Sequence, residues 1–503
     1  MRVPSDNLSD PIFHHAQARP ASIAVIDGCD RLDFRAFAAL IAKASVYLRD
    51  LGIAEGDRIG IALTNSADHV ILMFAVARSG ATLVELSIDD DAEALAATAR
   101  KYAIGTIFTE AHAPAIDGVR QIPVGLFWRR EIEGKSGDHR SATPGDKLYI
   151  LMLSTGSTGI PSAWMLTHRN FCRVLEMREA WFLSRGWDAG REHAHFLLAN
   201  PLRFVWFQIL VGLQVRAGGT LVIVPEFIRP PDMLRAFAAW ENAVSYITAN
   251  TCRYFLRAAP ERAFLLPNFR WLESGGLVFA GDEKRAMAAH VTENYYECYG
   301  STGGGLITGL SAPEMATKAD TVGRPAEGMT IEIVDGAGRV LPPGEIGEVR
   351  CRPLWALRLD TEMVSRGTER VENGWCYPAD IGLLDEDGYL YLKGRTADLI
   401  RREGTDIFAP EIEAVIASHP AVAEAAVIAL PSTTRGQEII AFVVKHGAID
   451  HDELGRFCRA RLAPERLPDR VYYTDAIPRI AGQKPDRLRL QALAAAETAR
   501  NSG

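Results

Sequence analysis

The sequence lacks the features that mark membrane and nucleic-acid-binding proteins. No run of about 18 consecutive apolar residues occurs, and the first residues do not join a basic region to an apolar stretch. Lysine and arginine form no stripe with interleaved aromatic residues, and the net charge of -8 is spread along the chain. We therefore expect a soluble, cytoplasmic protein with no membrane span and no nucleic-acid partner.

Cysteine pairing signals are also missing. The seven cysteines are scattered, odd in number and never spaced as Cys-x-x-Cys. Isolated thiols of this kind usually behave as small buried hydrophobic groups. They are expected to be reduced and structural, and no direct protein ligand for a metal is expected.

Low-complexity tracts and fixed-period repeats are absent as well. Apolar residues make up 48% and charged residues 23% of the chain, as is typical of a globular protein. A length of 503 residues exceeds what one hydrophobic core normally supports, so more than one domain is expected.

Apolar periodicity in the first two-thirds of the chain alternates between strand and helix. Asp33 precedes apolar positions that share one helical face up to Leu48, and Gly52 follows. A strand, a helix and a strand are then predicted, which indicates a parallel sheet covered on both faces. Those three elements, and four later ones, are expected at 58–63, 66–78, 81–86, 148–153, from about 169, 220–224 and 245–248.

The pattern changes from about Thr330. Short β-like pieces separated by Asp-Gly and Pro-Pro-Gly turns predict a smaller β-rich subdomain, and beyond Arg395 an αβ pattern predicts a separate domain. The expected fold class is α/β, with a large N-terminal domain of layered α/β subdomains plus a small β-rich subdomain. A small mobile α+β C-terminal domain is expected to follow.

Two segments rich in glycine and hydroxyl side chains are suited to binding phosphate. Leu153-Ser-Thr-Gly-Ser-Thr-Gly159 follows a predicted strand, and such a loop leaves backbone N–H groups free to surround phosphate oxygens. It lacks the Gly-Lys-Ser/Thr ending of a Walker loop, and alone it is more typical of a flexible loop. Tyr299-Gly-Ser-Thr302 offers a ring for an adenine and a hydroxyl for an α-phosphate, or is simply a glycine-rich strand end.

Two further segments carry charge. Asp380 and Arg395 flank a predicted hairpin, where a carboxylate and a guanidinium suit the two hydroxyls of a ribose, although such pairs are usually surface ion pairs. Lys484 lies on a loop near the C-terminus, where a lysine can neutralise a carboxylate and a phosphate together. Alone, a lysine of this kind is nearly always a solvated surface group.

In order and separation, the four segments resemble those of the ANL superfamily of adenylate-forming enzymes, which includes acyl-CoA synthetases, peptide-synthetase adenylation domains and luciferases. Val322-Gly-Arg-Pro325 and Pro410-Glu-Ile-Glu413 add to the resemblance, which covers nearly the whole chain. It implies an AMP-binding domain over 1–394, a hinge over 395–398 with Ala397 and Asp398, and a mobile domain over 399–503.

The resemblance also implies roles for individual residues. Thr302 and Lys484 are the expected catalytic residues, and Gly404 is expected in a pantetheine tunnel. The residues expected to bind ATP or AMP are Ser154, Thr155, Gly156, Ser157, Thr158, Gly159, Tyr299, Gly300, Ser301, Asp380 and Arg395. Those expected around the acyl group are Phe204, Trp206, Ser274, Gly275, Gly276 and Gly303.

Several positions depart from the family pattern. Ser162 stands where the phosphate loop usually has lysine, and Gly303 stands in place of the glutamate that helps place magnesium. Ala379 replaces a glycine before Asp380, Ala397 replaces the common hinge aspartate, and Asp398 is next to it. These changes indicate a divergent member.

The acyl side departs from the family too. Phe204 replaces a common histidine, and with Trp206 it forms a bulky apolar wall that favours an aryl or modest aliphatic acid over an amino acid. Arg203 either pairs with a second carboxylate of the acid or faces solvent.

The expected function is ATP- and Mg²⁺-dependent activation of a small carboxylic acid to an acyl-adenylate, followed by transfer to a thiol, with CoA as co-substrate. One alternative is a stand-alone enzyme that loads the phosphopantetheine of a carrier protein or an amine. Another is a degenerate protein that binds nucleotide or acyl ligands without turnover. The oligomeric state and the acid are not predicted.

Overall fold

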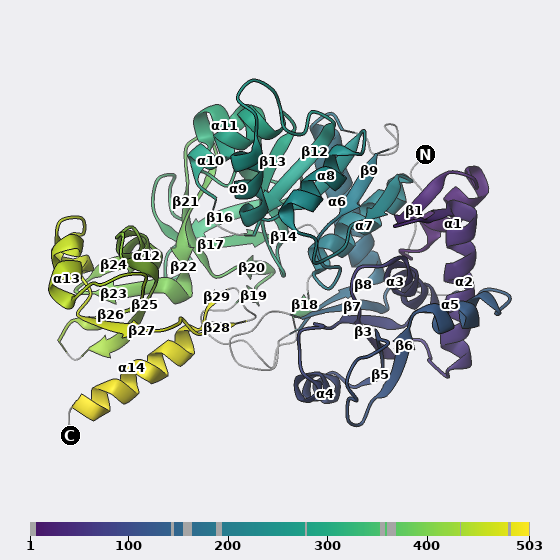
Figure 1. Cartoon of the computed structure of the whole chain (residues 1–503), viewed down its shortest axis with the longest axis horizontal. Coiled ribbons are helices and arrows are strands. Elements are labelled where there is room, and N and C mark those ends of the chain that lie inside the picture. Colours follow the sequence, from purple (N-terminus) through teal and green to yellow (C-terminus); the bar gives the residue numbers. More distant parts are fainter. Residues whose placement is uncertain are drawn as a thin grey trace.

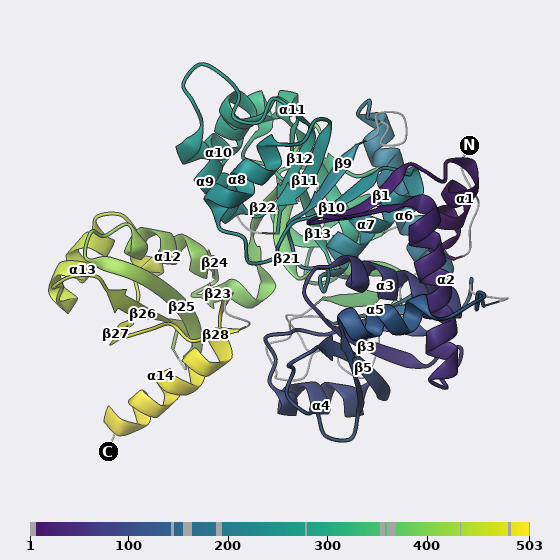
Figure 2. The same cartoon turned by 45° about the vertical axis from the view of Figure 1, so that its right-hand side comes forward.

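The computed structural model describes residues 7–141, 145–153, 163–187, 194–276, 279–352, 358–359, 369–432, 434–480 and 484–501. Its fold class is the predicted one, a large N-terminal region of layered sheets and helices followed by a small C-terminal region (Figure 1). The C-terminal region lies at one end of the molecule in both views, and its last helix projects away from it (Figures 1 and 2).

A nine-stranded sheet in the order β15-β14-β13-β12-β11-β9-β10-β1-β2 forms the first layer. Neighbouring strands from β13 to β1 pair in parallel, while β14, β15 and β2 pair antiparallel. The strands are β1 (Ile23–Asp27), β2 (Asp30–Asp33), β9 (His195–Leu198), β10 (Thr220–Ile223), β11 (Ala243–Ile247), β12 (Phe269–Gly275), β13 (Tyr295–Ser301), β14 (Gly305–Ser311) and β15 (Arg324–Pro325).

A seven-stranded sheet in the order β18-β8-β7-β4-β3-β5-β6 forms the second layer. Strands β3 to β7 pair in parallel as predicted, but β8 runs antiparallel to β7 where the sequence indicated only a turn. The strands are β3 (Arg58–Ala62), β4 (Thr82–Glu85), β5 (Ile104–Glu110), β6 (Arg120–Val124), β7 (Leu148–Leu153), β8 (Ala163–Thr167) and β18 (Arg358–Leu359).

The predicted β-rich subdomain is a six-stranded sheet, and smaller sheets follow from Leu399 onward. The six strands are β16 (Thr330–Val334), β17 (Gly347–Arg352), β19 (Arg370–Glu372), β20 (Trp375–Tyr377), β21 (Asp380–Leu384) and β22 (Leu390–Arg395). The later strands are β23 (Leu399–Arg402), β24 (Thr405–Phe408), β25 (Val422–Ser432), β26 (Gly436–Lys445), β27 (Arg470–Thr474), β28 (Arg479–Ile480) and β29 (Lys484–Pro485).

Helices cover the sheets, and their boundaries follow from capping residues. The Asp33 carboxylate accepts from the N–H of Ala36 at 2.7 Å and begins α2, while the Ser66 hydroxyl caps α3. The helices of the large region are α1 (Asp10–Ala18), α2 (Phe34–Asp50), α3 (Ala67–Ser79), α4 (Ala92–Lys101), α5 (Leu126–Glu133), α6 (His168–Ser184), α7 (Val205–Ala217), α8 (Pro230–Ala238), α9 (Ala249–Ala258), α10 (Gly281–Ala286), the π-helix η1 (Met287–Val291) and α11 (Ala312–Lys318). The C-terminal region adds the short helices η3 (Thr396–Asp398) and η4 (Pro464–Arg466), together with α12 (Ala409–Ala417), α13 (His451–Arg459) and α14 (Arg487–Asn501).

The nine-stranded sheet is buried on both faces. Because alternate strand residues point to opposite sides, Phe196 and Leu198 share a core with α6 and α7, whereas Leu197 lies in a core that includes α8 and α9. The cysteines are free, and all except the exposed Cys29 are buried, as expected for structural thiols. None of the helices in the described ranges has the length and apolar character needed to cross a bilayer.

Candidate active site

The candidate site begins at the carboxyl ends of β12 and β13. These parallel strands are paired in register with Gly275 beside Cys298, so Ser274-Gly-Gly276 and Tyr299-Gly-Ser-Thr302 leave the sheet at the same edge. Open α/β sheets bind ligands at this edge. Two segments separated by more than 20 residues of sequence are thus neighbours, as required for one site.

Three residues predicted to bind the nucleotide lie together there. Asp380 and Arg395 are directly opposite each other in the antiparallel pair β21 and β22, and Arg395 Nε lies 3.5 Å from Asp380 Oδ1. The Tyr299 hydroxyl donates to Asp380 Oδ2 at 2.5 Å. Burial, followed by the nearby Asp380 carboxylate, raises the pKa of Tyr299 well above its usual value, so the phenol stays protonated and donates.

The two charged partners differ in exposure. The Asp380 side chain is 9% exposed and that of Arg395 is 52% exposed, so the carboxylate is fixed while the guanidinium reaches solvent. Ala379, the residue before Asp380, has a φ of 64°, a left-handed conformation that costs about 1–2 kcal/mol for a residue with a Cβ atom. The glycine expected at this position would adopt it without that cost.

The turn after β13 is held by a carboxylate that sequence reasoning did not single out. The N–H groups of Thr302 and Gly303 donate to Glu369 Oε1 and Oε2 at 3.3 and 2.9 Å. Burial raises the pKa of Glu369, although the two N–H groups and Arg395 oppose that shift. Glu369 belongs to none of the four motifs and lies 66 residues from Gly303, so the sequence offered no signal for this contact.

Gly303 has a steric partner on the other large sheet. A Cβ atom at residue 303 would overlap the indole ring of Trp164, which lies on β8 and is almost fully buried. Trp164 therefore occupies the space that the family's glutamate side chain at residue 303 would need. Gly300 is close-packed in the same way, since a Cβ there would overlap the carbonyl oxygen of Gly305. The Ser301 hydroxyl accepts from the N–H of Gly304 at 2.9 Å.

Part of the predicted site lies outside the described residues. This applies to the whole phosphate loop, namely Ser154, Thr155, Gly156, Ser157, Thr158 and Gly159, and to the side chains of Ala397 and Lys484. The backbone of Lys484 pairs with Ile480 in the hairpin β28–β29. That hairpin lies on the side of the C-terminal region that borders the large region (Figures 1 and 2).

Asp398, expected in the hinge, is tied to the start of α14. Its carboxylate lies 2.6 Å from Arg487 Nε, and Arg487 Nη1 lies 3.0 Å from Glu413 Oε1. The three residues thus link η3, α12 and the chain just after Lys484. Gly404, expected in a tunnel, lies in the turn between β23 and β24 with a φ of 81° and open space around its Cα.

The residues predicted around the acyl group fall into different environments. Trp206 lines a narrow pocket between α6, α7 and β14, whereas the Phe204 side chain is 42% exposed and is not among that pocket's described lining residues. The Ser274 hydroxyl is buried against the Tyr295 hydroxyl at 2.5 Å. Gly275 packs against the Cys298 carbonyl oxygen, and Gly276 has a φ of 80°.

Arg203 does not face solvent, which was one of the two positions considered for it. Its guanidinium forms an ion pair with Glu226, whose side chain is buried, and lies 3.4 Å from Asp89 Oδ2. It is therefore occupied within the protein and is only 15% exposed.

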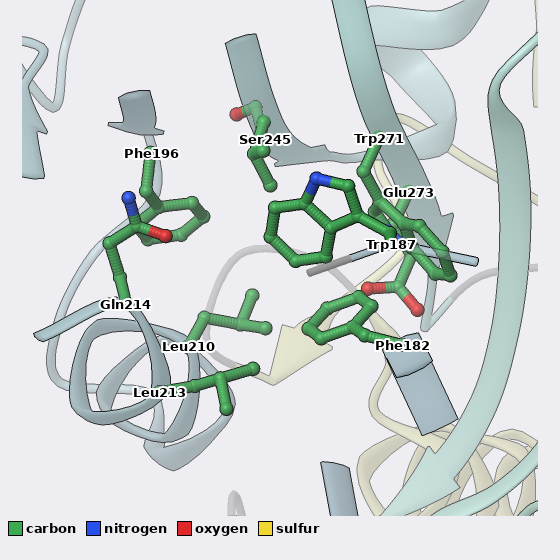
Figure 3. Close-up of a pocket in the computed structure, with 10 residues that line it drawn as sticks. Phe182, Trp187, Phe196, Leu210, Leu213, Gln214, Ser245, Trp271 and Glu273 are labelled. Carbon is green, nitrogen blue, oxygen red and sulfur yellow. The ribbon is translucent and has the colours of Figure 1, made fainter. Parts of the chain in front are cut away.

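A second pocket lies deeper beside the same helices. Aromatic rings of Phe182, Trp187 and Trp271 surround it together with leucines of α7, and the Glu273 carboxylate lies among these rings (Figure 3). Each of the two pockets has room for about one water molecule. Within the described ranges, no group of three or more His, Cys, Asp or Glu side chains is placed to hold a metal ion.

Comparison with known proteins agrees with this geometry. The family model for AMP-binding enzymes matches residues 12–355, and the model for their C-terminal domain matches residues 411–484. A long-chain fatty-acid–CoA ligase of Mycobacterium tuberculosis is 28% identical over 89% of this chain and 90% of its own length. A 2-succinylbenzoate–CoA ligase of Bacillus cereus is 26% identical over 97% of this chain and 99% of its own length.

Solved structures share the whole fold. The o-succinylbenzoate CoA synthetase of Bacillus subtilis, in complex with an acyl-adenylate intermediate, superimposes with a TM-score of 0.82 at 24% identity. That comparison covers 96% of this chain and 97% of the synthetase. The family models together span most of the chain in the order that its motifs predict. The chain belongs to the AMP-binding enzymes, the ANL superfamily of adenylate-forming enzymes.

Proposed function

We propose that the protein is a carboxylate–CoA ligase, which activates a carboxylic acid with ATP to an acyl-adenylate and then transfers the acyl group to CoA. The observation that carries the proposal is the assembly of Tyr299, Asp380 and Arg395 beside the Thr302 turn. This assembly stands at the ligand-binding edge of a parallel sheet, with an apolar pocket next to it. CoA ligases among its relatives support CoA as the acceptor.

In the proposed first step, the acid's carboxylate attacks the α-phosphorus of ATP, and pyrophosphate leaves. Asp380 accepts from the ribose hydroxyls and the exposed Arg395 donates to them. Thr302 contacts the α-phosphate region, Ser154 to Gly159 hold the β- and γ-phosphates, and Lys484 brings the two anions together. Rate enhancement of this kind comes from positioning and charge stabilisation.

In the proposed second step, the CoA thiolate attacks the carbonyl carbon of the mixed anhydride, and AMP leaves. The proposed domain division is 1–394 and 399–503 with a hinge at 395–398, and Gly404 lies in the domain expected to complete the thioester site. Mg²⁺ would be held mainly by the phosphate oxygens of ATP, where it would neutralise their charge. Gly303 has no side chain to offer it, and the carboxylate at the Thr302–Gly303 turn is that of Glu369.

The test is pyrophosphate release with MgATP across aryl, short-chain and dicarboxylic acids, with and without CoA. At least one acid should give release, and acyl-CoA should form only when CoA is present. Lys484→Ala should reduce release by about 10²–10³-fold. Lys445→Ala, which changes another lysine of the C-terminal region that lies beside the Tyr473 ring, is the matched control and should keep full activity.

The proposal is wrong if no acid in the panel supports release, or if Lys484→Ala leaves release unchanged. Thioester that appears only with a carrier protein would reassign the acceptor. Tight ATP binding without pyrophosphate or AMP would identify a binding protein without turnover.

A further inference from the structure

A buried ion pair separates the two pockets beside α6 and α7. Arg178 on α6 pairs through Nη2 with Glu273 Oε2 on β12, and both side chains are 2% exposed. Arg178, Trp206 and Leu306 line the narrow pocket between α6, α7 and β14, which we call the outer pocket. Glu273 lines the second pocket with Phe182, Trp187 and Trp271, which we call the inner pocket (Figure 3). The pair therefore stands at the inner end of the outer pocket.

The pair is not fully satisfied by the protein. Arg178 Nε, Arg178 Nη1 and Glu273 Oε1 are buried and have no hydrogen-bond partner within the protein. The Trp206 indole N–H, which lines the same outer pocket, is also buried without a partner. The Cys298 thiol beside Glu273 is only a weak donor. Buried donors and acceptors left unpaired are costly, so this cluster is suited to a ligand that supplies both an acceptor and a donor.

Neighbouring rings hold the guanidinium in place. Arg178 Cζ lies 4.6 Å from the centre of the Phe182 ring and 5.1 Å from that of Trp206, so the planar group is held between aromatic side chains. Its free N–H groups keep a fixed direction as a result. A fixed donor fork recognises one geometry of acceptor better than a flexible amine does.

One lining residue of the outer pocket lies beside the candidate nucleotide-binding turn. Leu306, one of its lining residues, lies four residues after Thr302 and pairs with Gly300 across β13 and β14. This pocket holds about one water molecule as it stands, so an acid whose carboxylate lies at Thr302 has to displace the apolar lining to place its far end beside Arg178. The proposed function supplies this orientation.

The charge of the pair selects among polar groups. Arg178 and Glu273 neutralise each other, so a second carboxylate on the acid would bring an uncompensated charge to a buried site. A hydroxyl or carboxamide can accept from Arg178 and donate to Glu273 Oε1 without adding charge. Arg203, the cation first considered for a second carboxylate, is already paired with Glu226.

We propose that Arg178 and Glu273 form the specificity site of the acyl pocket, which recognises a neutral hydroxyl or carboxamide at the end of the acid remote from its carboxylate. This inference rests on the proposed function, because it requires that an acid bind beside Thr302. It narrows the substrate class from any aryl or modest aliphatic acid to those with such a terminal group.

The experiment compares matched acids in ATP–pyrophosphate exchange. The probes are phenylpropanoic acid with its para-hydroxy derivative, and hexanoic acid with its terminal hydroxy and carboxamide derivatives. The ratio of kcat/KM for each derivative to that of its parent should be about 10–100 in the native protein, since one well-paired buried group is worth that much.

The double variant Arg178→Met/Glu273→Met should bring this ratio to about one or below. Replacing a buried ion pair by apolar side chains is often neutral for stability, so the variant is expected to fold, and thermal unfolding checks this. Glu273→Gln, which retains the shape of the side chain, should reduce the ratio less. The matched control is Lys284→Met/Glu297→Met, an equally buried pair outside both pockets, which should leave the ratio unchanged.

The possible failures are distinguishable. If no acid supports exchange, the proposed function fails. If parents and derivatives exchange equally well in the native protein, or if the folded double variant keeps the preference, the specificity site is wrong while the ligase assignment stands. A ratio that falls equally in the Lys284→Met/Glu297→Met control would show that any loss of a buried pair changes selectivity, which also overturns the proposal.

Discussion

The proposed ribose side and the proposed phosphate side of the candidate site are built differently. On the ribose side, Tyr299, Asp380 and Arg395 follow the family pattern and contact one another. On the phosphate side, Trp164 fills the space of a residue 303 side chain, and Glu369, the residue just before β19, holds the backbone of the turn. The departures from the family pattern fit one another, because Gly303 is sterically required once Trp164 is present.

Activity should be more sensitive to the loss of one charge on the ribose side than to a change on the phosphate side. Asp380→Asn removes the carboxylate that accepts from Tyr299 and faces Arg395, and a hydrogen bond to a charged group is worth about 1.5–3 kcal/mol. We expect kcat/KM for ATP to fall by about 10–100-fold. Steady-state pyrophosphate release at varied ATP measures this, and Tyr299→Phe, which keeps the carboxylate, should cost less. An unchanged ATP dependence in the Asp380→Asn variant would place the ribose elsewhere.

On the phosphate side, replacing Gly303 alone by the family's glutamate should destabilise the protein. Gly303→Glu forces a side chain into the Trp164 indole, and overpacking of this kind typically costs about 1–3 kcal/mol. We expect a lower thermal midpoint for Gly303→Glu than for the native protein.

A double variant tests whether the Trp164 indole is what excludes a side chain at residue 303. Trp164→Ala opens a cavity and destabilises alone, but combined with Gly303→Glu it should cost less than the sum of the two single changes. A double-mutant cycle by thermal unfolding measures this coupling. Strict additivity would show that the indole is not what excludes a side chain at 303.

Glu369 gives the phosphate side a pH dependence of stability that begins in the acidic range. Burial raises its pKa above the usual 4.5, so the folded state binds its proton more tightly than the unfolded state. Its contribution is favourable at low pH and is lost as the pH rises through the folded pKa, with a slope of at most about 1.4 kcal/mol per pH unit.

Unfolding curves of the native protein and Glu369→Gln at several pH values test this. As the pH rises above about 4.5, the native protein should lose stability relative to the glutamine variant. Any difference due to the amide itself is an offset independent of pH. Parallel stability curves across this range would contradict the raised pKa.

The smallest effect is expected next to Asp380. Ala379 has a left-handed φ, and Ala379→Gly removes that strain while adding freedom to the unfolded chain. The net gain should be below about 1 kcal/mol, with little change in ATP dependence. Gly388→Ala, the opposite change at a turn with a φ of 80° and open space, is a matched control that should destabilise.

Local patterns predicted the elements well. The strand at Leu148–Leu153 and the helix after Asp33 depend on apolar periodicity and a cap, which are encoded within a few residues. The antiparallel strand β8 was missed because it begins just after the glycine-rich loop, which indicated only a turn.

Contacts between distant segments account for what the sequence did not predict in the site. The order of the motifs led to Asp380 and Arg395. The structure pairs these two residues in one hairpin, and their roles stay predictions. Glu369 and the pair of Arg178 with Glu273 belong to no motif, because each depends on packing between strands or helices far apart in sequence. Arg203 was judged by its neighbours in sequence, while its partner Glu226 lies on another segment.

The ion-pair chain from Asp398 through Arg487 to Glu413 restricts where the C-terminal region can pivot. Asp398 is anchored to the residue that begins α14, three positions after Lys484. Torsion angles beyond Asp398 cannot change much without breaking these contacts. A reorientation of this region would therefore occur by rotation about the backbone torsion angles of Thr396 and Ala397. The Lys484 hairpin and α12 would then move together as one rigid unit.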